Sequence, residues 1–272
     1  MQKILYIFIF SFCTLLCSGQ IRVTEDDYLY EAFKKEAVGD YNSAIDIYNT
    51  RIRIKPDCAY GYFYRGRAKI KTEDYRGAIN DLDKAISIDS RFSIAYNERG
   101  LAKIFLKDYN GAIEDCNKAI EINTNFANAY TNRCLAKKNS NDIEGAIKDC
   151  DKSIEINPYC AIAYNNRGLV RSEIKRYYQA IEDFDKAVML NSNYEEAYLN
   201  RGIALYYSGS FTKAIIDCNR VLRINPDNAR AYYLRGIAKL ERRANDDACS
   251  DLRKARDLGY RDAVRLINEY CK

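Results

Sequence analysis

The residue types present in this 272-residue chain limit the chemistry that it could carry out. The chain contains no histidine, which removes the commonest general base, the commonest metal ligand and every Ser-His or Cys-His catalytic arrangement. The sequence also has no Cys-x-x-Cys pair, no standard phosphate-binding glycine loop and no nucleophile elbow. We therefore expect no enzyme activity, no cofactor and no metal site.

Arginine and aspartate recur at a fixed spacing. The arginines follow one another at a constant interval: Arg65, Arg99, Arg133, Arg167, Arg201 and Arg235. An aspartate follows each of them, always at the same distance along the chain: Asp81, Asp115, Asp149, Asp183, Asp217 and Asp251. A charged side chain that becomes buried in a fold needs a partner of opposite charge, and the recurring aspartate could supply it. We therefore expect structural ion pairs, with an anion-binding ladder as the alternative.

The same 34-residue interval organises most of the chain. It divides the sequence into seven units, residues 25–58, 59–92, 93–126, 127–160, 161–194, 195–228 and 229–262. In every unit the fourth residue is tyrosine and the twentieth is alanine, and all three prolines of the chain fall at the thirty-second position. A period of this length indicates a repeat architecture. Positions below are counted from the first residue of each unit.

Each unit has the pattern of two helices joined by a polar turn. Apolar residues of the second half recur at three- and four-residue spacing, as in 112–120, which is one face of a helix. Proline at position 32 cannot continue that helix. One helix pair buries too little surface alone, so neighbouring units must stack into a continuous core. The sequence predicts an all-α solenoid of seven helix-turn-helix repeats, with residues 263–272 forming a capping helix.

The landmarks of each unit, aromatic-x-x-x-Gly, Asp-Tyr-x-x-Ala and Ala-x-x-x-x-Pro, resemble the tetratricopeptide repeat family over residues 25–262. The resemblance implies a right-handed superhelical solenoid and a protein-binding scaffold. Departures from the family pattern are few: Arg51, Cys134 and Asn245. The segment from Leu258-Gly259-Tyr260 to Tyr270-Cys271-Lys272 resembles the close of exported repeat proteins from the Bacteroidota.

Ligands of this family usually lie along the concave surface that the first helices form. The resemblance places a partner-binding groove at Tyr60, Phe63, Arg67, Lys71, Asn97, Leu101, Phe105, Thr131, Asn165, Tyr206, Tyr207 and Tyr233. This strip is apolar and aromatic at both ends, which is typical of a partner surface. The alternative is that it only lines the inner wall. Chaperone-binding members need Lys at position 5 and Asn at position 9 of one unit, and no unit has that pair.

The first nineteen residues have the layout of a secretory signal peptide. Lys3 precedes the apolar stretch 4–16, and small residues follow in Cys17-Ser18-Gly19. The stretch is shorter than the ~20 residues of a membrane-spanning helix, so we expect cleavage before Gln20, a short lead over 20–24, and no membrane span. Lipidation of Cys17 is the alternative, although Leu16 stands where lipoproteins have a small residue. We expect export to the periplasm, the cell envelope or the medium.

The cysteines that follow the predicted cleavage site have two interpretations. Cys116, Cys150 and Cys218 share a position that is apolar in the other units, which predicts buried small hydrophobic residues. Export to an oxidising compartment also permits disulfides. We predict one between Cys249 and Cys271, because the last repeat helix and the capping helix should be antiparallel neighbours.

Charge balance limits the kind of partner. The chain has 43 basic and 38 acidic residues, a net charge of +5, and this excess is too small to predict nucleic-acid binding. We therefore expect an exported scaffold that binds a protein or peptide in its concave groove. The alternative is a structural component of a cell-envelope assembly that contacts its partners through its outer faces.

Overall fold

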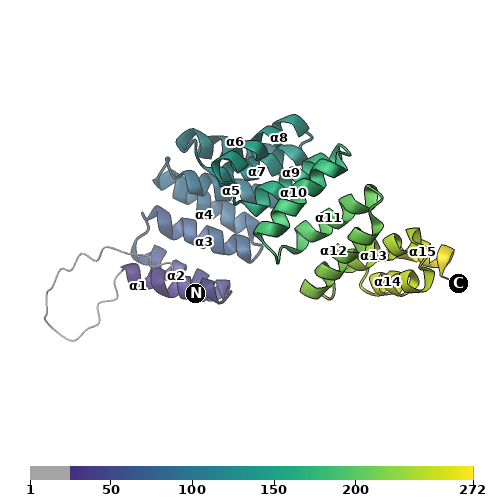
Figure 1. The fold of residues 1–272 in the computed structure, drawn as a ribbon. Helices are drawn as coiled ribbons and strands as arrows, with labels where there is room; N and C mark the ends of the chain where they lie inside the picture. Colours follow the sequence, from purple (N-terminus) through teal and green to yellow (C-terminus); the bar gives the residue numbers. More distant parts are fainter. Residues whose placement is uncertain (1–24, 272) are drawn as a thin grey trace, which may run out of the picture.

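The computed structural model describes residues 25–271; the predicted signal peptide, with Cys17, and the lead at 20–24 lie outside the described residues. Over this range the chain forms fifteen α-helices and no strand. Figure 1 shows the helices following one another along a curved solenoid, with α1 at one end and α15 at the other. The all-α repeat solenoid is confirmed. None of these helices is long and apolar enough to cross a membrane.

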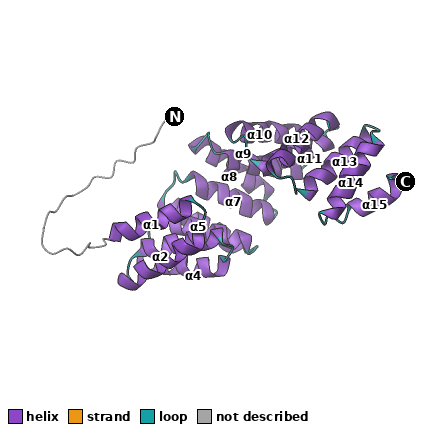
Figure 2. Ribbon diagram, turned by 90° about the horizontal axis from the view of Figure 1, so that it is seen from below, coloured by secondary structure: helices purple, strands orange, loops and turns teal. Residues whose placement is uncertain are grey.

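The helices come in pairs, one pair to a unit, and the connections between them are short loops (Figure 2). The first helices are α1 (Glu25–Ala37), α3 (Ala59–Lys71), α5 (Ser93–Phe105), α7 (Ala127–Asn139), α9 (Ala161–Glu173), α11 (Glu195–Tyr207) and α13 (Ala229–Glu241). The second helices are α2 (Tyr41–Ile54), α4 (Tyr75–Ile88), α6 (Tyr109–Ile122), α8 (Ile143–Ile156), α10 (Tyr177–Leu190), α12 (Phe211–Ile224) and α14 (Asn245–Asp257). A last helix, α15 (Ala263–Tyr270), packs against α14.

A residue in the left-handed backbone conformation, at position 15, lies in the tight turn between the two helices of each unit. Two units have glycine there, with φ of 79° at both, and the other five have a side chain at φ of 60–67°: Glu73, Lys107, Asn141, Lys175 and Arg243. In the first four units an aspartate follows and accepts a hydrogen bond from the third amide of the second helix, at 2.9–3.2 Å. This capping bond explains the Asp of the Asp-Tyr-x-x-Ala motif.

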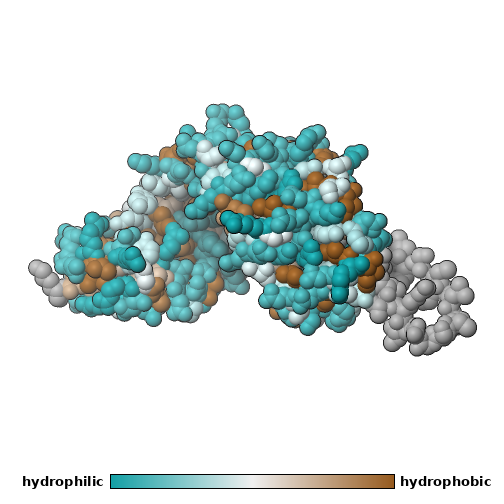
Figure 3. All heavy atoms as spheres, turned by 180° about the vertical axis from the view of Figure 1, so that it is seen from behind, coloured by the Kyte–Doolittle hydropathy of each residue, from teal (hydrophilic) through white to brown (hydrophobic). Residues whose placement is uncertain are grey.

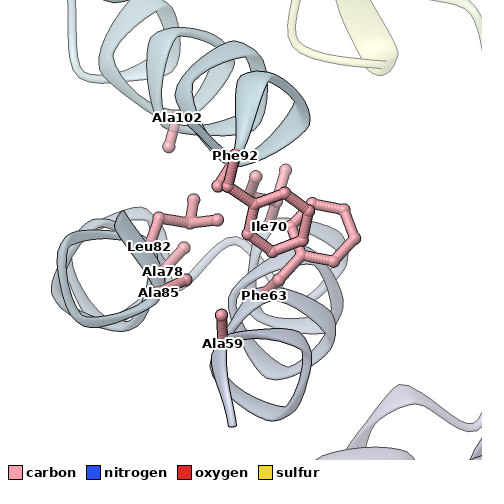
Figure 4. Close-up of a cluster of buried hydrophobic side chains, with 9 residues drawn as sticks. Ala59, Phe63, Ile70, Ala78, Leu82, Ala85, Phe92 and Ala102 are labelled. Carbon is pink, nitrogen blue, oxygen red and sulfur yellow. The ribbon is translucent and has the colours of Figure 1, made fainter. Parts of the chain in front are cut away.

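Small residues let the two helices of a unit approach closely. The alanine at position 20 is fully buried in all seven units. A Cβ atom added to Gly168, at position 8, would lie 2.7 Å from the Phe184 ring. The core therefore runs through the stacked units. The face of the molecule in Figure 3 is mostly hydrophilic, and its apolar side chains lie in separate patches. Figure 4 shows the core between units two and three, where Phe63, Leu82 and the Phe92 ring meet buried alanines from α3, α4 and α5.

Within residues 25–271, two disulfides join neighbouring helices. Cys249 on α14 is bonded to Cys271 just after α15, with Cα atoms 5.5 Å apart, and this bond ties down the capping helix. The second bond links Cys134 on α7 to Cys150 on α8, also with Cα atoms 5.5 Å apart. Cys150 is buried, as expected, but it forms this disulfide and is not a free thiol packed in the core. Cys116 and Cys218 are the buried free thiols.

Candidate functional site

The first helices form the inner side of the solenoid. Successive first helices contact one another along the chain, from α3 and α5 to α11 and α13, whereas successive second helices make no comparable contacts within residues 25–271. Elements that approach more closely lie on the inside of a curve. We call the surface of α1, α3, α5, α7, α9, α11 and α13 that faces away from the second helices the inner wall.

Four of the groove candidates are exposed on this wall. Lys71 is exposed, Tyr60 and Phe105 are each 51% exposed, and Tyr207 is 62% exposed. Each aromatic ring rests on another ring. Tyr60 lies 4.8 Å from Phe92 between centroids, while Phe105 stacks on the tyrosine at position 17 of the preceding unit at 4.7 Å, and Tyr207 does so at 5.4 Å. These supports hold the rings in place before any partner arrives.

Four further candidates are half-buried: Arg67, Leu101, Tyr206 and Tyr233. Arg67 donates to Glu36 at 2.7 Å and lies 5.0 Å from the Tyr64 ring centroid. The Tyr206 hydroxyl donates to Glu241 at 3.3 Å. Burial is the main cause that raises the pKa of Tyr206 to about 12, and the negative charge of Glu241 is the second. Arg67 and Tyr206, which lie toward opposite ends of the wall, thus already have partners within the chain.

The remaining candidates, all at position 5, lie beneath the wall. Phe63, Asn97, Thr131 and Asn165 are 2–5% exposed. Asn97 and Asn165 each accept a hydrogen bond from the asparagine at position 6 of the next unit, at 2.9 and 3.0 Å. Thr131 shares a 2.7 Å hydrogen bond with Ser153. Close approach of neighbouring first helices covers this position, so these residues offer almost no accessible surface to a partner, and Asn97 and Asn165 bond to the next unit.

The sequence reasoning missed a hollow at the first two units. It has a volume of about 470 Å³ and is lined by Phe33, Glu36, Tyr41, Arg67 and Lys71, among others. Phe33 occupies position 9 of unit one, the position that the groove candidates Arg67 and Leu101 occupy in units two and three. Extending the groove positions to unit one would have identified Phe33.

The arginines and aspartates of the 34-residue period lie together in all six units that have them. The guanidinium and carboxylate are 2.5–2.6 Å apart within each unit. A second arginine nitrogen donates to position 25 of the preceding unit at 2.6–2.7 Å. The guanidinium also lies 5.2–5.6 Å from the ring centroid of the tyrosine at position 4.

This Arg–Asp ladder, made of the residues at positions 7 and 23, connects each unit to the one before it. The aspartates are 2–4% exposed, so their charges depend on the arginines for compensation. Because protein acceptors already engage the guanidinium nitrogens, the geometry favours the structural interpretation over anion binding.

The thiols that remain free differ in environment. Burial raises the pKa of Cys116 and of Cys218 to about 12. At Cys58 burial also acts to raise the pKa, but hydrogen bonds from Arg51, 3.0 Å away, and from the Gly61 amide outweigh it, and the pKa is lowered. No cluster of three or more His, Cys, Asp or Glu side chains in residues 25–271 could hold a metal ion.

Several solved structures have the same arrangement of helices. A chain in the crystal structure of the APC/C hetero-tetramer Cut9-Hcn1 superposes with a TM-score of 0.81 at 17% identity, over 91% of this chain and 49% of that chain. The present chain thus spans about half the length of that chain. A tetratricopeptide repeat protein from Parabacteroides merdae gives 0.67 at 19% identity, over 91% and 99%. PilF from Pseudomonas aeruginosa gives 0.66 at 21% identity, over 75% and 95%.

Sequence comparison gives the same assignment for most units. No curated protein sequence matches the chain. Family models described as Tetratricopeptide repeat match residues 59–92, 94–126, 127–160, 161–194 and 195–228, which together make up more than half of the chain. The matched segments follow the 34-residue register with a single one-residue difference. The chain belongs to the tetratricopeptide repeat family.

Proposed function

We propose that this protein is an exported scaffold that binds a protein or peptide along its inner wall. The observation that carries the proposal is the set of exposed aromatic rings, Tyr60, Phe105 and Tyr207, each supported by a second ring. Fully burying such a side chain contributes about 1.5–3 kcal/mol. Aromatic anchors with little conformational freedom are typical of interface hot spots.

The partner expected for this surface is a segment with apolar side chains. Lys71 is the accessible charge among the groove candidates, because Arg67 is already paired with Glu36 at 2.7 Å. The buried amides beneath the wall have partners within the chain. Affinity would therefore come from apolar burial at the rings and in the hollow near Phe33.

The test compares substitutions on the two sides of the solenoid. Crosslinking in the native host followed by mass spectrometry identifies the partner, and binding is then measured with purified protein. We expect Phe105→Asp and Tyr207→Asp each to weaken binding at least about tenfold, as loss of a buried ring implies. Tyr178→Asp is the matched control, because Tyr178 is a 75% exposed aromatic on the second helix α10. Circular dichroism should show unchanged helicity in all three variants.

A second function is supported by apolar residues on the second helices. Tyr178, Met189 and Ile216 are 58–75% exposed there, as a structural component of an envelope assembly that uses its outer faces would require. In that case Tyr178→Asp weakens capture and Phe105→Asp leaves it intact. The two proposals therefore predict opposite results from the same pair of variants.

Export is part of the proposal and is tested separately. It rests on the pattern of residues 1–19, from Lys3 to Cys17-Ser18-Gly19. N-terminal analysis of the protein purified from its host should begin at Gln20. An intact Met1 would contradict export by this route, and an acylated Cys17 would show a lipoprotein instead.

A further inference from the structure

One copy of the Arg–Asp ladder lacks a component that the other five copies have. In units two to five and in unit seven, a second basic residue at position 11 contacts the position-23 aspartate. These residues are Lys69, Lys103, Lys137, Arg171 and Lys239, and their nitrogens lie 2.7–2.9 Å from the Oδ2 atom of that aspartate. In unit six the residue at position 11 is Leu205. In the described part of the chain, Asp217 therefore pairs with Arg201 alone.

The missing cation leaves one guanidinium to pair with two carboxylates at unit six. Arg201 contacts both Asp217, at 2.6 Å, and Asp185 of unit five, at 2.7 Å. Two carboxylates thus share a single ion-pair partner. In unit three, by contrast, two cations face two aspartates. Among the six ladder copies, only this one combines an aspartate at position 25 of the preceding unit with no cation at position 11.

A cavity lies where the missing side chain would be. Its volume is about 220 Å³, and it opens between α10 and α12 above α11, which packs against both. Ile181, Leu205 and Ile216 supply apolar walls, Asp185 and Asp217 supply carboxylates, and the Arg201 guanidinium that both carboxylates share lies in the lining as well. Lys213 also borders the cavity, but it is exposed and forms no ion pair with either carboxylate in the described part of the chain. Ile216 is 58% exposed, so the cavity opens to solvent.

The chemistry of this cavity suits one class of group. Asp217 is 3% exposed, and burial raises its pKa while the Arg201 hydrogen bond opposes the rise. A buried carboxylate with spare acceptor capacity is stabilised by an added charged donor. The apolar walls suit a methylene chain, because long amine side chains bury their stems and direct the charge to a polar end. The five other ladder copies hold a long cationic side chain at the corresponding place, lysine in four of them and arginine in unit five.

We propose that this cavity binds a primary alkylammonium group, with the nitrogen at Asp217 and the alkyl chain against Ile181, Leu205 and Ile216. The group is either a lysine side chain of a partner protein or a free alkylamine, and both have the same chemistry. The site is separate from the inner wall, so this inference does not depend on the proposed groove. It gives the layer of second helices a binding specificity of its own.

The first experiment measures ligand binding to the mature protein with small probes. We expect n-butylammonium chloride to raise the thermal midpoint in a saturable way, whereas tetramethylammonium chloride at equal ionic strength does not, because a quaternary ion has no N–H to donate. Nα-acetyl-lysine methylamide is the second probe. If it binds more tightly than n-butylammonium, a partner lysine is the ligand; if it binds more weakly, a free amine is. A wild-type protein that responds to neither probe overturns the proposal.

Variants test whether the response comes from this cavity. Leu205→Lys rebuilds the pattern of the five other ladder copies and should abolish the response to n-butylammonium. Thr212→Lys adds the same charge outside the cavity lining and should leave the response unchanged. Asp185→Asn, an exchange already present at position 25 of three other units, should weaken binding at least tenfold. A full response in Leu205→Lys would assign the binding to another site and overturn the proposal.

Discussion

Units one to four and units five to seven have the same fold but begin their second helices differently. In α2, α4, α6 and α8 an aspartate side chain caps the helix, whereas α10, α12 and α14 follow Arg176, Ser210 and Ala244, none of which forms a capping side-chain bond. The helix pairs nevertheless stack throughout. The comparison shows that packing between units determines the architecture, while the caps adjust how stable each unit is.

The difference predicts where the solenoid opens first. In a repeat protein each unit contacts only its neighbours, so stability is a sum of local terms. Units one to four have four capped second helices and the Cys134–Cys150 bond. Units five to seven have no such cap. Unit six also has Leu205 at position 11, where the other five ladder units have a lysine or an arginine. We therefore expect hydrogen exchange to be faster in units five and six than in units three and four, with unit seven held by Cys249–Cys271.

The largest effect should come from the Arg–Asp ladder, which both regions share. Asp183→Ala leaves Arg167 and Arg171, which lie 2.6 and 2.8 Å from this carboxylate, without their common partner. Removing one side of a buried pair costs about 3–5 kcal/mol. Arg167→Ala should cost less, because Arg171 still compensates Asp183. Urea unfolding monitored by circular dichroism gives both values.

A double-mutant cycle separates pairing from the loss of each side chain. The variant with Arg167→Leu and Asp183→Leu should be less destabilised than Asp183→Leu alone, because the single variant leaves both Arg167 and Arg171 without Asp183 whereas the double variant leaves only Arg171. The exposed pair Lys148 and Glu144 is the control, and its variants should change the free energy of unfolding by less than about 1 kcal/mol. Additive effects of Arg167 and Asp183 would contradict the ladder as a coupled unit.

The disulfides should have the next largest effect, one in each region. Replacing Cys134 and Cys150 by alanine removes a cross-link between residues 16 apart, and the chain-entropy model gives about 3 kcal/mol for a loop of this size. Exchange should then accelerate in α7 and α8. Cys116→Ala, at a buried free thiol, is the control for loss of volume at the same repeat position.

The C-terminal bond should have a more local effect. Breaking Cys249–Cys271 should release α15, which has a neighbour on one side only, and leave units one to four unchanged. Non-reducing peptide mapping checks the bond directly. A Cys271 that is free and alkylatable in the protein purified from its host would contradict it.

Exchanging the caps tests the comparison between the two regions directly. Asp142→Ala in unit four should lower stability by about 1 kcal/mol, because the Gly145 amide, which donates to Asp142 at 2.9 Å, loses its acceptor. Arg176→Asp in unit five should raise stability by up to about the same amount. Hydrogen exchange at the start of α8 and α10 reports both changes. If Arg176→Asp has no effect, the difference in capping is not what separates the two regions.

Much of this organisation could be predicted from the sequence, because it depends on repetition. The period, the helix pairs and the proximity of Arg167 to Asp183 all follow from residues that recur at one spacing. Positions 8 and 24 have the same separation along the chain as positions 7 and 23. They also face each other, because a Cβ atom added to Gly100 would lie 3.2 Å from Cys116 Sγ. The same reasoning would have paired Cys134 with Cys150.

The burial of position 5 could not be predicted in the same way. Whether Asn97 lies on the inner wall or beneath it depends on how closely α5 and α7 approach. That distance is set by the packing of all the small residues between the units rather than by Asn97 itself. Amphipathic spacing identifies a face of a helix, and the curvature of the solenoid decides which part of the face remains accessible.

The smallest effect should come from the left-handed residue at position 15, which is glycine in units one and six and has a side chain in the others. Lys107 has φ of 63°, a conformation that costs a non-glycine residue free energy. Glycine removes that cost but adds freedom to the unfolded chain. Lys107→Gly should therefore stabilise unit three by no more than about 1 kcal/mol. Asn141→Gly should gain less, because asparagine tolerates this region. Equal gains at both positions in urea unfolding would show that side-chain strain is not what distinguishes these turns.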